Sequence, residues 1–190
     1  MEILKRKFSL EEINSGDIQI GDVIELPEFT VPEAIIRKKQ DLTFNPQIIK
    51  DSATVYNIKN GMFYLIFNHA LFMSPIDLNN ERNWGSTQLG YYLETVFKRN
   101  MINAKIPTEH IFLPSKGEMF GVNALSFFKD GKNRTAFDNQ EKKSVFCWLR
   151  TLDRECSKST FYHVGPDGSS DGASRSYMNL FVRPCFIISL

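Results

Sequence analysis

Six side chains could supply a nucleophile, a general base or a metal ligand: Cys147, Cys156, Cys185, His69, His110 and His163. Thiols and imidazoles do such chemistry when their spacing brings them together, as in a metal site or a nucleophile with its base. None of the six has a partner at such a spacing. Cys147 and Cys185 lie inside apolar runs, where a thiol packs as a small hydrophobic group. We therefore expect no catalytic residue, no metal site, no cofactor and no enzymatic activity.

A polar stretch from Asp167 to Tyr177 is the better candidate for binding. Asp, Ser, Arg and Tyr side chains form adaptable hydrogen bonds and ring contacts with sugars and proteins. The candidate binding residues are Asp167, Ser169, Ser170, Asp171, Arg175 and Tyr177. A solvated loop without a ligand is an equally good interpretation. A calcium-dependent sugar site is disfavoured, because Asp167 and Asp171 alone supply too few oxygen ligands.

A set of large or charged side chains is expected to hold the structure together: Trp84, Glu118, Trp148, Arg150 and Arg183. Both arginines stand in apolar runs, where a guanidinium is costly to bury unless carboxylates, carbonyls or ring faces meet it. We interpret them as structural, packed against Trp148 or Glu118 and holding loops to a sheet. Ligand binding by either arginine is the alternative.

The composition is that of a globular domain with many rings. The chain has 190 residues, of which 42% are hydrophobic and 16 are Phe. That length supports one core, and a core of rings favours a fold that contains β-structure. The formal net charge of +1 gives no broad positive field of the kind that drives nucleic-acid binding. No apolar run has the length of a signal peptide or a membrane span, so we expect neither membrane insertion nor a cleavable signal.

Patterns in the first half of the chain predict short elements and one clear helix. A capping-box spacing from Ser9 to Glu12 predicts a short helix that ends near Gly16, and Pro32 could begin another through residues 34–36. The apolar run 62–67 predicts a buried strand, with 71–73 as a shorter one. With Ser86 as the expected N-cap, one apolar helical face is formed by Leu89, Tyr92, Leu93, Val96 and Phe97.

The second half favours strands joined by turns and loops. Residues 106–114 are expected to be extended between two prolines, and Ser115 with Glu118 repeats the capping-box spacing. Residues 127–140 are interpreted as a long loop pinned by rings. Three strands follow after Val145, and the turn residues Gly165-Pro166-Asp167-Gly168 predict a tight hairpin with a bulge.

An ordered set of short motifs resembles a bacterial and bacteriophage domain family of unknown function. The set runs from a helix start at Trp84 through a Leu-Pro-Ser-x-x-Glu segment ending at Glu118 and a Trp-Leu-Arg-Thr strand at Trp148 to Val-Arg-Pro at Arg183. The resemblance covers about Met62 to Ile188. It departs from the family's pattern at Thr151, where Ser is usual, and at Phe181, where Gly is usual.

The resemblance implies an α+β fold of the C-type-lectin-like kind, in the same broad group as formylglycine-generating enzymes. Such a domain has two helices and a twisted antiparallel sheet. It would occupy residues 61–190, preceded by an N-terminal arm or docking segment over residues 1–60.

The function implied by the resemblance is that of a non-enzymatic interaction module in a phage or prophage virion. It would be a head-decoration or tail/baseplate accessory protein, made in the host cytoplasm and present in many copies. Residues 1–60 would bind capsid or tail proteins, while the other domain faces a host glycan or protein. The alternative is a carbohydrate-binding or adhesin-like module that recognises bacterial surface glycans.

Overall fold

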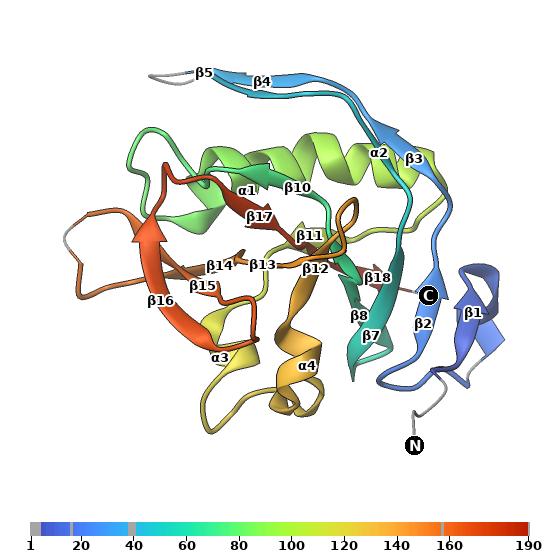
Figure 1. The fold of residues 1–190 in the computed structure, drawn as a ribbon. Coiled ribbons are helices and arrows are strands. Elements are labelled where there is room, and N and C mark those ends of the chain that lie inside the picture. The colour runs from blue at the N-terminus through green and yellow to red at the C-terminus, as the bar shows by residue number, and fades with distance from the viewer. Residues whose placement is uncertain (1–4, 16, 38–40, 157, 190) are drawn as a thin grey trace.

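The computed structural model describes residues 5–15, 17–37, 41–156 and 158–189. Its largest element is a six-stranded sheet (Figure 1). The strands, in spatial order, are β1 (Lys7–Ser9), β2 (Val23–Glu25), β7 (Ser52–Lys59), β8 (Met62–Phe67), β18 (Cys185–Ser189) and β11 (His110–Phe112). The run 62–67 is thus the buried strand that the sequence predicts.

A five-stranded sheet carries most of the C-terminal residues. Its order is β10 (Phe72–Ser74), β17 (Leu180–Val182), β14 (Cys147–Leu152), β15 (Thr160–Val164) and β16 (Ser170–Arg175). A three-stranded sheet consists of β13 (Ser144–Val145), β12 (Ala136–Asp138) and β9 (His69–Ala70). The expected hairpin is confirmed: β15 and β16 are antiparallel with a register shift, and Gly168 closes the turn with a φ of 80°.

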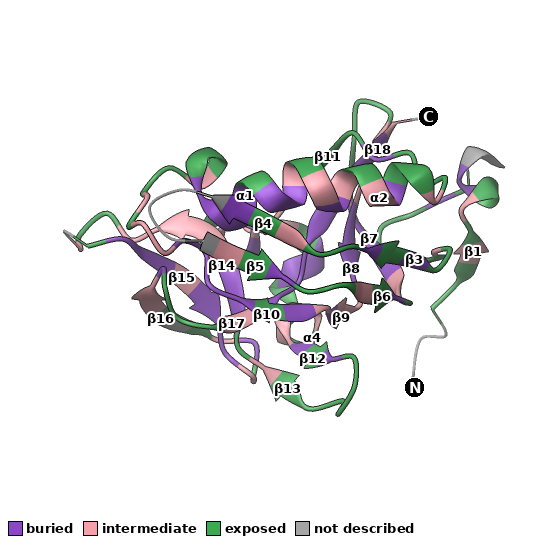
Figure 2. Ribbon diagram, turned by 90° about the horizontal axis from the view of Figure 1, so that it is seen from above, coloured by how far each residue is buried: buried purple, intermediate pink, exposed green. Residues whose placement is uncertain are grey.

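Two strand pairs form one long ribbon over residues 29–49. β3 (Phe29–Val31) pairs with β6 (Gln47–Ile49), and β4 (Ala34–Arg37) pairs with β5 (Asp41–Phe44). The helix expected after Pro32 is therefore wrong. The ribbon runs alongside the long helix (Figure 2), where Phe44 stacks on Tyr92 with ring centroids 3.8 Å apart. Ile36 is also buried there, so packing on the helix favours the extended state of these residues.

The long helix is built from α1 (Gln88–Tyr92), a π-helical segment η3 (Leu93–Phe97) and α2 (Lys98–Asn103). Its N-cap is Thr87, whose side chain accepts from the Gly90 amide, rather than Ser86. Ser86 belongs to the preceding 3-10 turn η2 (Trp84–Ser86). Gly90 is required at this join, because a Cβ there would lie 2.3 Å from the Trp84 carbonyl oxygen.

The remaining helices are single turns: η1 (Glu11–Ser15), α3 (Lys116–Met119), η4 (Ser126–Lys129) and α4 (Gly131–Arg134). The capping box at Ser115 and Glu118 is confirmed. The segment 127–140, expected to be one long loop, contains most of η4 and all of α4 and β12. Among the described residues, no helix is both long enough and apolar enough to span a membrane.

The fold is α+β, with mostly strands and few short helices. It differs from a single antiparallel sheet, because β1 with β2, β9 with β12 and β14 with β17 are parallel pairs. Residues 1–60 also do not form a separate arm, because the expected boundary between residues 60 and 61 falls in the turn of the β7–β8 hairpin. Buried side chains from both sides of that boundary, such as Ile24 and Phe186, share one core.

Candidate functional site

Arg183 is buried, and carbonyl oxygens surround its guanidinium. Its Nε donates to the Phe67 carbonyl at 2.7 Å, and its Nη1 donates to the carbonyls of Asn133 at 3.1 Å and Thr135 at 3.2 Å. Burial lowers the pKa of this arginine. The side chain thus ties the end of β8 to the end of α4 and the residue before β12, and its hydrogen bonds go to these carbonyls rather than to Trp148 or Glu118.

The other expected anchors lie on β14 itself (Trp148 and Arg150), in α3 (Glu118) and in η2 (Trp84). Arg150 pairs with Glu118 at 2.9 Å and lies over the Phe112 ring. Trp148 is fully buried, and its Nε1 donates to the Ser74 carbonyl at 2.8 Å. Trp84 is partly buried in η2, where its carbonyl accepts the Thr87 amide and hydroxyl.

The six candidate binding residues divide between the two ends of β16. Asp167, Ser169 and Ser170 lie at the turn, where the Asp167 carboxylate accepts the Ser169 amide at 2.9 Å. Hydrogen bonds from the Ser169 side chain and amide lower the pKa of Asp167. Arg175 and Tyr177 lie at or beyond the other end, with Arg175 opposite Thr160. A strand of this length spans roughly 17 Å, so these residues do not form one site. The side chain of Asp171 lies outside the described residues.

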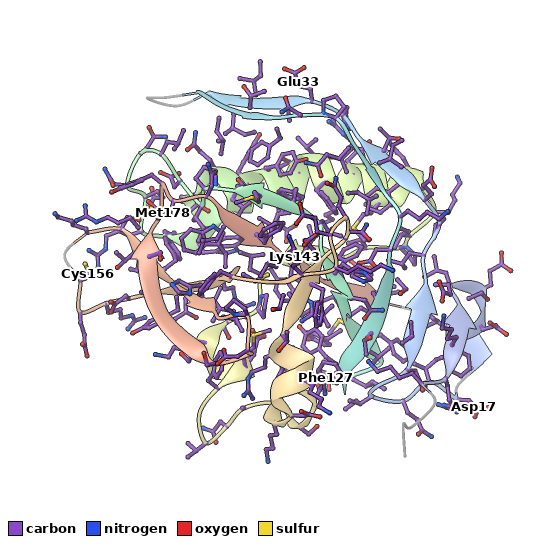
Figure 3. The ribbon with its side chains drawn as sticks, in the orientation of Figure 1. Asp17, Glu33, Phe127, Lys143, Cys156 and Met178 are labelled. Carbon is purple, nitrogen blue, oxygen red and sulfur yellow. The ribbon has the colours of Figure 1, made fainter. Side chains whose placement is uncertain are left out.

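A groove of about 850 Å³ lies elsewhere, between β6, β10 and the β12–β13 hairpin. Residues 46–49 form one wall, 70–73 with Phe181 another, and 138–141 with 143–145 the third. Figure 3 labels Lys143 on this hairpin. The Asn139 amide donates to the Lys50 carbonyl at 3.4 Å, linking the hairpin to the chain just after β6. Four separate stretches of the chain therefore build the groove, the fourth being Phe181 on β17.

Exposed apolar side chains and strand edges line this groove. Ile48 and Met73 are 68% and 54% exposed, and each is the middle residue of a three-residue strand. Among the described strands, β10 ends the five-stranded sheet, and β6 pairs only with β3. The groove thus presents large apolar groups beside strand edges that no described strand covers.

The charged groups of the groove are already engaged. The carboxylate of Asp138 accepts the amides of Glu141, Gln140 (2.9 Å) and Lys143 (3.2 Å). These hydrogen bonds lower the pKa of Asp138, and the one from the Glu141 amide has the largest effect. Lys143 pairs with Glu141 at 2.6 Å. The charged side chains that line the groove are therefore held by hydrogen bonds and an ion pair within the β12–β13 hairpin.

Two histidines have carboxylate partners that the sequence did not indicate. His69 Nδ1 lies 2.7 Å from the buried carboxylate of Asp51, whose other oxygen accepts the His69 amide. His110 lies 3.3 Å from Glu94. An Asp–His pair can orient a general base, but no described hydroxyl or thiol hydrogen-bonds to the His69 ring. The partners are 18 and 16 residues away, so only the fold brings them together.

The cysteines differ in environment. Cys147 and Cys185 are buried, and burial raises the pKa of the Cys147 thiol to about 12 and that of Cys185 further. Cys156 is partly exposed in the loop between β14 and β15 (Figure 3), and its pKa is lowered, chiefly by a hydrogen bond from the Lys158 amide. Within the described part of the chain, no group of three or more His, Cys, Asp or Glu side chains could hold a metal ion.

Comparison with known proteins identifies part of the chain. The search of curated proteins and the search of solved structures found no match. One family model matches the chain, and the match begins at Asn103, the last residue of α2. The resemblance expected from the sequence begins earlier, at about Met62. The matched region leaves out two of the segments that line the groove, residues 46–49 and 70–73. Residues 103–190 match the family model of a domain of unknown function, DUF6273.

Proposed function

We propose that this protein is a non-enzymatic interaction module and that a protein segment binds in the groove between β6, β10 and the β12–β13 hairpin. The observation that carries the proposal is the pair of exposed side chains, Ile48 and Met73, on strands whose outer edges have no partner among the described strands. An extended segment can add to such an edge through main-chain hydrogen bonds and cover the apolar groups.

The engaged charges support binding over catalysis. Because Asp138 is held by the amides of its own turn and Glu141 by Lys143, a ligand in the groove meets no unpaired acid or base on this wall. Amide side chains at Gln47 and Gln140 add neutral hydrogen-bonding groups. A near-neutral ligand of mixed apolar and polar character fits this lining best.

The sequence resemblance supports a place in a phage or prophage virion. In that role the partner is a capsid or tail protein, and many copies decorate one particle. The proposed docking segment, residues 1–60, contributes Pro46–Ile49 to the groove wall. The same resemblance supports a C-type-lectin-like arrangement of the DUF6273 domain, which an experimental structure compared with lectin-like folds tests.

Mass spectrometry of purified particles tests the virion role. We expect the wild-type protein in particles, and we expect Ile48→Glu with Met73→Glu to remove it, because two carboxylates would be buried without partners. Val122→Glu is the matched control, since Val122 is 98% exposed and lies away from the groove. Absence of the wild-type protein from particles contradicts the virion role. Equal incorporation of the groove variant contradicts the groove as the docking surface.

A glycan-binding or adhesin-like module is the second candidate. Tyr177 favours it, because its ring is half-exposed just beyond Arg175, and rings with polar neighbours are suited to sugars. A glycan array tests this function. Reproducible binding of a surface glycan that Tyr177→Ala removes would support it, and an array without reproducible binding would reject it.

A further inference from the structure

A second pocket, of about 310 Å³, lies at the end of β16 opposite the hairpin turn. Its lining residues are Asn80, Arg82, Lys158, Ser159 and Arg175. Three of these five carry a positive charge, and none is a carboxylate. They come from the loop after β10, the loop before β15 and the last residue of β16, so folding brings the three cations together.

Hydrogen bonds hold the walls of this pocket in place. The buried Asp77 carboxylate accepts the amides of Asn79 at 2.6 Å, Glu81 at 3.1 Å and Gln88 at 3.0 Å, which fixes the loop that carries Asn80 and Arg82. The Ser159 hydroxyl donates to the Glu81 carbonyl at 2.5 Å. The pocket is therefore formed before any ligand arrives.

A further bond joins the two loops, because Arg82 Nη1 donates to the Cys156 carbonyl at 3.0 Å. By contrast, the side chains of Lys158 and Arg175 form no hydrogen bond or ion pair with any described residue. The nearby carboxylate of Glu81 accepts the amides of Arg82 and Asn83, both at 2.8 Å. That of Asp153 accepts the Glu155 amide at 3.2 Å. Lys158 and Arg175 thus line the pocket without an ion pair to any described residue.

We propose that this pocket binds a phosphate group. Arginine forks and a lysine ammonium are the donors that meet phosphate oxygens with charge-assisted hydrogen bonds. A dianion gains about twice the Coulomb attraction of a carboxylate at the same distance, so three cations favour phosphate over carboxylate. The volume admits the phosphate and the first atoms of a molecule that carries it. The site is separate from the groove, so it stands or falls independently of the proposed function.

Calorimetric titration at constant ionic strength tests the site, with inorganic phosphate, glycerol 3-phosphate and acetate as probes. We expect saturable binding of at least one phosphate probe, at least tenfold tighter than acetate. Arg175→Gln and Lys158→Gln should each weaken it tenfold or more. Arg99→Gln and Lys59→Gln remove exposed cations elsewhere and should leave it unchanged. Tighter binding of the inorganic ion indicates free phosphate as the ligand, and tighter binding of the ester indicates a phosphate on a larger carrier.

Cys156 provides a second readout, because Arg175 is one of the groups that lower its pKa, after the hydrogen bonds from Lys158 and Thr160. A phosphate in the pocket offsets that cation, so alkylation of Cys156 at neutral pH should slow on saturation. Two results would overturn the proposal: no saturable binding by either phosphate probe, or variants at Lys158 and Arg175 that bind as tightly as the wild type. Acetate binding equal to phosphate would also refute it.

Discussion

Arg183→Ala should destabilise the protein strongly, because it removes a buried charge that satisfies several carbonyl groups. Hydrogen bonds that involve a charged group contribute about 1.5–3 kcal/mol each. Arg183 makes one such bond through Nε to Phe67 and at least one more through Nη1 to Asn133 and Thr135. Two bonds give about 3–6 kcal/mol by the same measure.

The desolvation that lowers the pKa of Arg183 acts against this gain. We therefore expect Arg183→Ala to lower the free energy of unfolding by about 3–4 kcal/mol, near the lower end of the range that the hydrogen bonds alone give. At about 2–4 °C per kcal/mol for a chain of this size, the melting temperature should fall by roughly 6–16 °C.

Urea unfolding followed by circular dichroism, with thermal melts alongside, measures the effect. Arg183→Lys keeps the charge but loses the fork, so it should lie between wild type and Arg183→Ala. Arg99→Ala, an exposed change, should stay within about 0.5 kcal/mol of wild type. A melting temperature for Arg183→Ala within 1–2 °C of wild type, which is about the effect of 0.5 kcal/mol, would refute the structural role.

Three further predictions concern single positions. Gly90→Ala should lower stability although alanine favours helices by about 1 kcal/mol, because its Cβ meets the Trp84 carbonyl; a raised melting temperature would contradict this. Asp138→Asn should destabilise the folded protein at pH 7. A carboxylate whose pKa is lowered by folding stabilises the folded state above its unfolded-state pKa, and this contribution is lost as the carboxylate is protonated. The difference in urea midpoint between wild type and Asp138→Asn should therefore shrink as pH falls below about 4. A constant difference from pH 7 to pH 3 argues against that role. Cys156 should be alkylated before Cys147 and Cys185, and because its pKa is lowered, its alkylation rate should rise at a pH below the usual thiol range. Mass spectrometry follows the labelling. Labelling of Cys147 at the same time would contradict its burial.

Local sequence signals predicted the elements whose cause is local. The turn at Gly165–Gly168 needs a residue with positive φ, and Gly168 supplies it. The capping box at Ser115 and the apolar run 62–67 are likewise visible in a few neighbouring residues. The helix face was also predicted, and its start is displaced by one residue because Thr87 rather than Ser86 reaches the Gly90 amide.

Features that depend on distant contacts could not be predicted in the same way. Pro32 is compatible with a helix start, but residues 29–49 form a ribbon of paired strands instead, because Ile36 and Phe44 pack on the long helix in that conformation. The groove is assembled from segments near Ile48, Met73 and Lys143, none of which has a motif. Arg175 was singled out for binding, but its neighbours in the pocket, Arg82 among them, are known only from the fold.

The central claim is that a protein segment occupies the groove, and a site-specific crosslink tests it most directly. A photoreactive amino acid at position 48 or 73, in protein assembled on purified particles, should crosslink to one defined segment of one partner. The same group at position 122 should not. Crosslinks from all three positions alike, or from position 122 alone, would contradict the claim that the groove is the binding surface.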